Sequence, residues 1–184
     1  MIAASLIMLS SLLGGFVVEA SAEKAYVLEI PREVLSRFVD DIGLFRRHMP
    51  GVVAVDRLDD GSYLYRTEKK TPLSGTFKSD FIIARLSTDD TLTVYRSVDS
   101  TDPNFMSCSV RIISAGEGRS GITVRLHLRL ERPSGGDVHW MAPILGERFI
   151  SERMQEDLEA MLSDFVRDSS VELYDRCRPA GGTR

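Results

Sequence analysis

The stretch LFRRHMPGVVAVDRLDDGSYLYR, residues 44–66, contains the change of periodicity on which the fold of this chain depends. Before Pro50 and Gly51 the apolar residues follow helical spacing, and after them apolar and polar residues alternate. A Pro-Gly pair commonly ends a helix, and Asp-Asp-Gly at residues 59–61 is typical of a hairpin turn. The stretch therefore predicts a helix that ends near Pro50 and an antiparallel hairpin directly after it.

The segment before the break, PREVLSRFVDDIGLFRRHM at residues 31–49, predicts two short helices rather than one. Pro31 suits the first turn of a helix, Asp40 and Asp41 can cap a second one, and Gly43 weakens continuity between the two. Before them, EKAYVLEI at residues 23–30 predicts a strand.

His48 falls at the end of the second predicted helix, where a positive or hydrogen-bonding group suits the helix terminus. The sequence contains no H-E-x-x-H, C-x-x-C or G-x-S-x-G pattern that would give this histidine a chemical role. A structural role for His48 is therefore favoured.

The segment after the break predicts three antiparallel hairpins. Their strands are expected at residues 52–58, 62–69, 76–87, 91–98, 104–114 and 121–132. In the last strand Ile122, Val124, Leu126, Leu128 and Leu130 share one face, and Thr123, Arg125, His127 and Arg129 share the other. This alternation predicts a sheet with one buried and one solvated face.

The C-terminal part predicts one long helix over residues 146–175, laid against the core by an apolar stripe. The stripe consists of Ile150, Met154, Leu158, Met161, Leu162 and Phe165. The expected fold is α+β: a helix-grip in which a curved antiparallel sheet of about seven strands surrounds a long C-terminal helix, with two short helices after the first strand. Such an arrangement leaves a cavity between sheet and helix unless large side chains fill it.

The N-terminal segment differs from the rest because residues 1–18 carry no charge. Ala20, Ser21 and Ala22 fit a signal peptidase site, so we expect a signal peptide cut after Ala22 and a chain exported to the periplasm or extracellular space. The alternatives are a membrane anchor formed by residues 2–18 and a buried core helix. Residues 23–175 then form a single ligand-binding domain, followed by a polar tail at residues 176–184.

Three stretches carry a resemblance to a known family. PREVLSRFVDDIGLFRRHMPGV follows an early strand, a glycine opens the fourth strand in GTFKSDF, and APILGERFISERMQEDLEAMLSDF leads into the last helix. The chain resembles the START/birch-allergen-like superfamily, also described as polyketide cyclase and lipid transport proteins, over residues 25–171. Within it the pattern is most similar to two groups, the G component of carbon monoxide dehydrogenase and the coenzyme Q-binding proteins. The resemblance implies that the chain carries an apolar molecule such as a quinone or lipid.

The candidate ligand-binding residues are apolar positions on the expected inner face of the sheet, in the segment 139–149 and on the helix stripe. They are Phe81, Met106, Cys108, Val110, Leu126, Leu128, Trp140, Met141, Ile144, Ile150, Met154, Leu158 and Met161. Trp140, Met141 and Ile144 either plug the end of the cavity or form a rim that admits a ligand or touches a membrane. Cys108 is expected to be a buried free thiol, although export would permit a bridge to Cys177.

Composition narrows the function classes. The chain has 184 residues, is 43% hydrophobic and carries a net charge of −4, which suits one globular domain and gives no reason to expect nucleic-acid binding. His48, His127 and His139 are scattered, so no metal site is predicted, and no cofactor is expected.

Three functions stay open: a carrier of a lipid, sterol, quinone or similar apolar molecule, a cyclase or dehydratase, or an interaction module with a filled cavity. Binding is favoured over catalysis because the sequence shows no convergent acid–base pair. The oligomeric state stays open.

Overall fold

The computed structural model describes residues 15–71, 75–137 and 142–177. Its elements are β1 (Phe16–Leu28), α2 (Arg32–Asp40), α3 (Ile42–His48), β2 (Val52–Arg57), β3 (Tyr63–Thr71), β4 (Gly75–Asp89), β5 (Leu92–Ser97), β6 (Asn104–Ser114), β7 (Ser120–Arg132), the short 3-10 helix η1 (Gly135–Asp137) and α4 (Ala142–Cys177). The predicted succession of a strand, two short helices, six strands and a long helix is confirmed.

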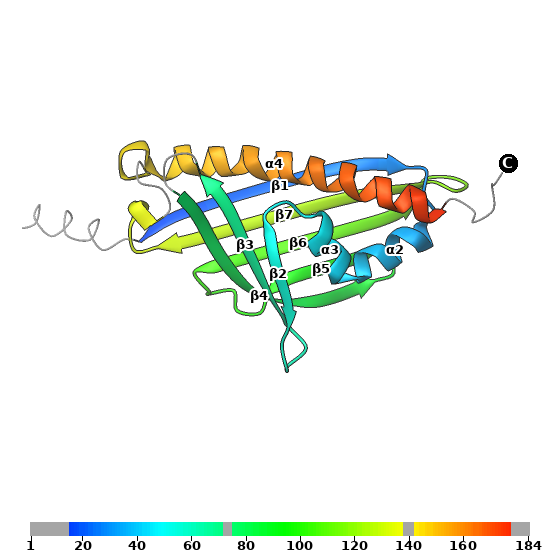
Figure 1. Cartoon of the computed structure of the whole chain (residues 1–184), viewed down its shortest axis with the longest axis horizontal. Coiled ribbons are helices and arrows are strands. Elements are labelled where there is room, and N and C mark those ends of the chain that lie inside the picture. Colours follow the sequence, from blue (N-terminus) through cyan, green and yellow to red (C-terminus); the bar gives the residue numbers. More distant parts are fainter. Residues whose placement is uncertain (1–14, 72–74, 138–141, 178–184) are drawn as a thin grey trace, which may run out of the picture.

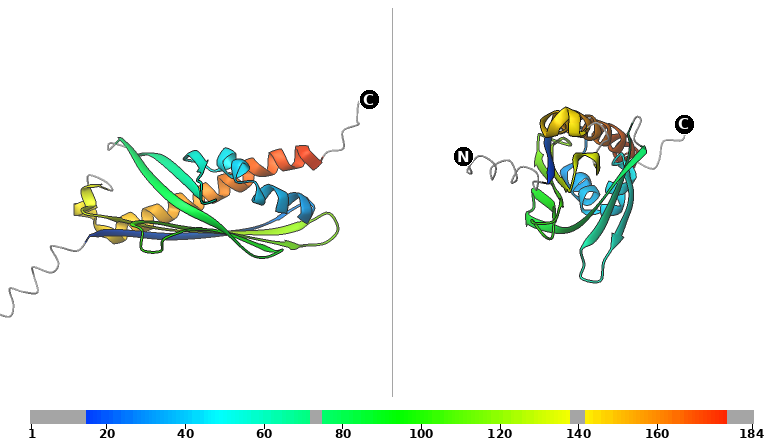
Figure 2. Two further views of the ribbon diagram at one scale, coloured as in Figure 1. Left: turned by 90° about the horizontal axis from the view of Figure 1, so that it is seen from below. Right: turned by 90° about the vertical axis from the view of Figure 1, so that its left-hand side faces the viewer.

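The seven strands form one antiparallel sheet in the order β1-β7-β6-β5-β4-β3-β2. Figure 1 shows α4 running along β1, and the end-on view in Figure 2 shows the sheet curving round beneath it. The outer edge of β1 is covered by α4, because the backbone N–H groups of Val17 and Glu19 donate to Glu147 Oε1 (2.8 Å) and Ser151 Oγ (3.2 Å). The predicted α+β helix-grip is confirmed.

Strand β1 begins at Phe16, so the prediction that it starts at residue 23 was wrong. Val18, Ala20 and Ala22 are buried against the core with exposed fractions of 0%, 4% and 4%, and they pair with Leu130, Leu128 and Leu126 of β7. Small residues in alternation fit both a signal peptidase site and the buried face of a strand. The predicted cut after Ala22 falls inside this strand, and residues 1–14 lie outside the described part.

The helices α2 and α3 are separate, as predicted, and the Asp41 carboxylate accepts a 2.9 Å hydrogen bond from the Gly43 N–H at the start of α3. Helix α4 begins at Ala142 and bends at Gly146, whose φ of 80° lies in the left-handed region that favours glycine. The helix thus starts four residues before the predicted range of residues 146–175. Residues 178–184 of the predicted tail lie outside the described part.

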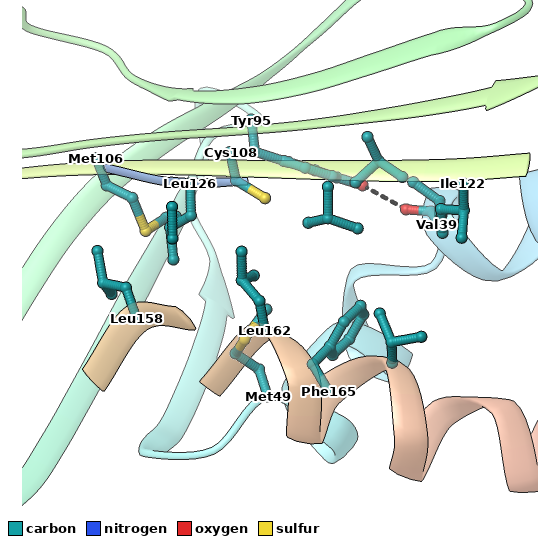
Figure 3. Packing of buried hydrophobic residues seen from close by; sticks show 14 of the residues in the cluster. Val39, Met49, Tyr95, Met106, Cys108, Ile122, Leu126, Leu158, Leu162 and Phe165 are labelled. Atoms are coloured by element: carbon teal, nitrogen blue, oxygen red, sulfur yellow. Dashed lines mark hydrogen bonds between the residues drawn. The ribbon is translucent and has the colours of Figure 1, made fainter. Parts of the chain in front are cut away.

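The core fills the space between the concave face of the sheet and α4. Figure 3 shows Met106, Cys108 and Leu126 of the sheet pointing toward Leu158 and Leu162 of the helix. At one end this core is closely packed by Phe165 together with the buried face of α2, which consists of Leu35, Phe38 and Val39. Toward the N-terminal half of α4, the side chains leave open space.

Candidate functional site

The open space is an apolar pocket of about 340 Å³ between the concave face of the sheet and α4. Its lining comes from β2 to β7, from the start of α3 and the turn after it, and from one face of α4. The inner part of the lining consists of Ile42, Met49, Val52, Tyr65, Ser79, Phe81, Ile83, Tyr95, Met106, Cys108, Leu126, Leu128, Leu130, Met154, Leu158 and Met161. A pocket of this size and character suits a small apolar ligand.

Many of the residues selected from the sequence lie together in this lining. They are Phe81, Met106, Cys108, Leu126, Leu128, Met154, Leu158 and Met161. Alternation along the strands and helical spacing on α4 place them on facing surfaces, as expected.

Other selected residues lie elsewhere. Val110 is buried outside this lining and borders a second, polar hollow beside α2, Ile150 is half-buried outside the lining, and Ile144 is 77% exposed. Trp140 and Met141 lie outside the described residues. Some selected residues lie outside the lining because the cavity occupies only part of the length of the sheet. The alternation of apolar residues shows which face of a strand is buried, but it does not show which residues on that face border the cavity.

Sequence reasoning missed several lining residues. Tyr65, Ile83 and Leu130 lie on the inward phase of their strands, so the same alternation could have identified them. Met49 and Gly51 belong to the turn after α3, and no sequence pattern indicates that this turn borders the pocket.

Two tyrosines and one cysteine are the titratable groups of the inner lining. Burial raises the pKa of the Tyr65 and Tyr95 hydroxyls well above 10, and it raises the pKa of the Cys108 thiol from 9.0 to about 12. All three groups are therefore neutral near pH 7. Cys108 and Cys177 are both free thiols, which confirms the expectation of a buried free thiol at Cys108.

The mouth of the pocket lies where lining residues become exposed, at Pro50, Gly51, Lys69 and Ala160. It is bounded by the turn after α3, by β3 and by α4. An ion pair between Lys69 of β3 and Asp157 of α4 spans this opening. Both side chains are partly exposed, so the pair contributes little to stability while it narrows the entrance.

Beyond the mouth, a second polar contact joins α3 to the C-terminal half of α4. His48 Nε2 lies 2.6 Å from Glu172 Oε2, and Arg47 Nη1 lies 3.1 Å from Glu172 Oε1. The hydrogen bond with His48 lowers the pKa of Glu172, and the Arg176 and Arg47 side chains add to this effect. His48 thus fastens α3 to α4 across 124 residues of sequence.

The outer face of the sheet carries the polar residues that the alternation predicts. Asp80 lies within 4.0 Å of Arg66 on the neighbouring strand, and Arg96 lies over the ring of Phe105 at 5.8 Å. Neither Asp80 nor Arg96 lines the pocket, and both are exposed. In the described ranges, no cluster of three His, Cys, Asp or Glu side chains could hold a metal ion. No helix in those ranges is long and apolar enough to cross a bilayer.

No protein-family model and no curated protein sequence matches this chain. Its structure is similar to a conserved protein from Geobacillus kaustophilus, with 12% identity, a TM-score of 0.59 and coverage of 84% of this chain and 95% of that one. It is also similar to the Zhui aromatase/cyclase from Streptomyces sp. R1128 (17% identity, TM-score 0.56, coverage 90% and 99%). A START superfamily protein from Mycobacterium smegmatis aligns at 14% identity and a TM-score of 0.55, with coverage of 83% and 98%.

At these identities the likeness concerns the fold. None of these three is described as a carbon monoxide dehydrogenase component or a coenzyme Q-binding protein, so the closer resemblance to those groups stays a prediction. The curved seven-stranded sheet, the two short helices after its first strand and the long C-terminal helix give this chain the START/polyketide cyclase-like fold.

Proposed function

We propose that this protein binds an apolar small molecule, such as a lipid, sterol or quinone, in the pocket between the sheet and α4 and carries it as a non-covalent complex. The observation that carries this proposal is the apolar lining of a preformed pocket of about 340 Å³. Moving an apolar molecule from water into such a lining is favoured by about 25 cal/mol per Å² of apolar surface buried. Met106, Met154 and Met161 add flexible side chains that adapt to irregular shapes.

A cyclase or dehydratase is the alternative, and it needs a group that gives or takes a proton beside the bound substrate near neutral pH. The inner lining offers two phenols and a thiol whose pKa values are raised by burial. The lining carboxylates Glu68, Asp157 and Asp164 are partly exposed. This distribution favours binding over acid–base catalysis.

An interaction module with a cavity filled by its own side chains is disfavoured by the volume of the pocket. Contact with a membrane surface belongs to our proposal as a route for loading. It is supported by Ile144 and Phe149 near the start of α4, which are 77% and 50% exposed and flank the basic Arg148. Cosedimentation with lipid vesicles tests it, and Ile144→Ser/Phe149→Ser is expected to weaken that binding.

Export also belongs to the proposal, supported by the uncharged segment at residues 1–18. Because residues 16–22 form part of β1, we propose that any cut of an exported carrier precedes Phe16. Cell fractionation followed by N-terminal sequencing tests both points. A mature protein that starts at Glu23 would contradict the second.

The direct test of binding is to purify the full chain under native conditions, extract it with organic solvent and identify released compounds by mass spectrometry. We expect a stoichiometric apolar compound. Met154→Trp is expected to lose most of it, because the indole occupies pocket space.

Ile150→Trp is the matched control, since Ile150 is half-buried one turn earlier on the same helix but does not line the pocket. This variant is expected to retain the compound. The proposal would be overturned if folded wild-type protein released no compound and also took up none of a panel of added lipids, sterols and quinones.

A further inference from the structure

The hydroxyl of Tyr65 is a polar group of the pocket lining without a hydrogen-bond partner among the described residues. Tyr65 lies on β3 between Val55 of β2 and Phe81 of β4, is only 5% exposed and contributes to the pocket lining. In the part of the chain that the structure describes, its hydroxyl takes part in no hydrogen bond. The hydroxyl of Tyr95, which also borders the pocket, donates a 2.9 Å hydrogen bond to the Val39 carbonyl, as Figure 3 shows.

Tyr65 lines the pocket, and its hydroxyl is not fully enclosed by protein atoms. Among the described side chains, Arg129 Nε is the only polar atom that is both fully enclosed and without a partner. The hydroxyl of Tyr65 is therefore still accessible to a molecule in the pocket, although the rest of the side chain is packed in the core.

An unpaired hydroxyl in an apolar interior is costly, and native proteins rarely keep one without a reason. A water molecule would need two to four polar partners to be held there. The inner lining supplies mainly methyl groups, aromatic rings and thioethers. Its other polar side chains, besides the two tyrosines, are the Cys108 thiol, a weak hydrogen-bonding group, and the Ser79 hydroxyl, which accepts a 3.5 Å hydrogen bond from Arg132 Nη2. The lining is therefore a poor site for an ordered water and a good site for a ligand atom.

We propose that Tyr65 donates its hydroxyl proton in a hydrogen bond to a neutral carbonyl oxygen of the bound molecule, and so selects apolar ligands that carry a ketone, quinone or ester group. This inference rests on the proposed binding function and names the ligand class. A carboxylate ligand is disfavoured because the inner lining holds no cation to pair with it. A pure hydrocarbon is disfavoured because it leaves the hydroxyl unpaired.

Burial supports the direction of this hydrogen bond. It raises the pKa of Tyr65 far above 10, and the Cys108 thiol adds to the effect, so the phenol keeps its proton at neutral pH and can donate it. A carbonyl oxygen accepts this hydrogen bond, and because it carries no proton itself it needs no second acceptor in the lining.

The test uses 9-fluorenone and fluorene, two rigid tricyclic compounds that differ only in one carbonyl group. Equilibrium dialysis against the full chain measures the affinity of each for wild type, Tyr65→Phe and Tyr63→Phe. Tyr63 lies two residues earlier on the same face of β3 but outside the lining, so its variant is the matched control.

We expect Tyr65→Phe to weaken fluorenone binding relative to fluorene binding by roughly tenfold, the effect of one lost hydrogen bond. Tyr63→Phe is expected to leave this ratio within about twofold of wild type. Thermal unfolding of each variant verifies that it is folded.

The outcomes separate the inference from the function. If both compounds bind and the ratio is unchanged in Tyr65→Phe, the carbonyl inference is overturned while the apolar pocket stands. If neither compound binds folded wild-type protein, the binding function fails and the inference fails with it. A ratio that falls equally in both tyrosine variants also overturns the inference, because the effect is then not specific to the lining hydroxyl.

Discussion

Deleting residues 1–22, the segment that the sequence assigns to a signal peptide, is expected to destabilise the fold more than deleting residues 1–14. The first deletion removes Phe16 to Ala22 from β1, together with their pairing to β7 from Leu126 to Arg132. It also uncovers the edge of the strand that supplies Leu126, Leu128 and Leu130 to the pocket. The second deletion leaves the whole of β1 in place.

The magnitude follows from the buried side chains that are lost. Val18 is 0% exposed, and Ala20 and Ala22 are each 4% exposed. Burial of one valine and two alanine methyl groups is worth about 3 kcal/mol in total. The lost ladder hydrogen bonds, worth about 1 kcal/mol each, are offset by the backbone entropy of the residues that no longer need to be ordered. A loss of about 3 kcal/mol is a large part of the 5–15 kcal/mol typical of a domain.

Urea unfolding followed by circular dichroism measures this difference between chains that start at residues 15 and 23. The chain that starts at residue 15 keeps the whole of β1 and is the reference. The chain that starts at residue 23 is expected to unfold at a clearly lower urea concentration and to melt roughly 6–12 °C lower. Equal midpoints for the two shortened chains would refute the reasoning, because Val18, Ala20 and Ala22 would then contribute nothing to the folded state.

Three further predictions concern single side chains. Tyr65→Phe, measured without ligand, is expected to leave the free energy of unfolding unchanged or to raise it by up to about 1 kcal/mol. Tyr95→Phe is expected to lower the free energy of unfolding by about 1–3 kcal/mol, because the buried Val39 carbonyl loses its donor. The opposite order of stability in urea unfolding would contradict this difference between the two hydroxyls. Because the pKa of Glu172 is held below 4.5 in the folded state, its ion pairs stabilise the fold above that pH and are lost as pH falls through the lowered pKa. The stability advantage of wild type over Glu172→Gln is therefore expected to be full near about pH 6 and to shrink toward about pH 3, and a difference independent of pH would be inconsistent with it. The Cys108 thiol is buried and has a pKa of about 12. It is expected to react with maleimide at least about a hundredfold more slowly in the folded protein than in urea. Mass spectrometry of peptides follows the reaction, and equal rates in the two conditions would show that the thiol is not enclosed.

The elements of the fold were predictable because their signals are local. The change from helical to alternating spacing at Pro50 and Gly51 separates α3 from β2, and Asp59 to Gly61 marks the turn between β2 and β3. The start of β1 was not predictable in the same way. Ala20, Ser21 and Ala22 satisfy two local patterns at once, and only pairing with β7 decides between them.

The candidate site was predictable in part. Strand phase placed Met106, Cys108 and Leu126 on the inner face, and helical spacing placed Leu158 opposite them. The position of the pocket along the sheet was not predictable, so Val110 was assigned to a lining that it does not reach. The contact of His48 with α4 was not predictable from local patterns either, because its partner Glu172 lies 124 residues away in the sequence.

Apart from the starts of β1 and α4, the sequence by itself determined which segments form strands and helices and which face of each is apolar, because these properties depend on neighbours within a few positions of the chain. Only the tertiary structure decided which apolar residues pack and which border open space, since that depends on how far the curved sheet stands from α4. It also decided that the Tyr95 hydroxyl meets a carbonyl while the Tyr65 hydroxyl meets the pocket. Two tyrosines in similar strand patterns differ in this way because hydrogen-bond partners are set by contacts between segments far apart in the sequence.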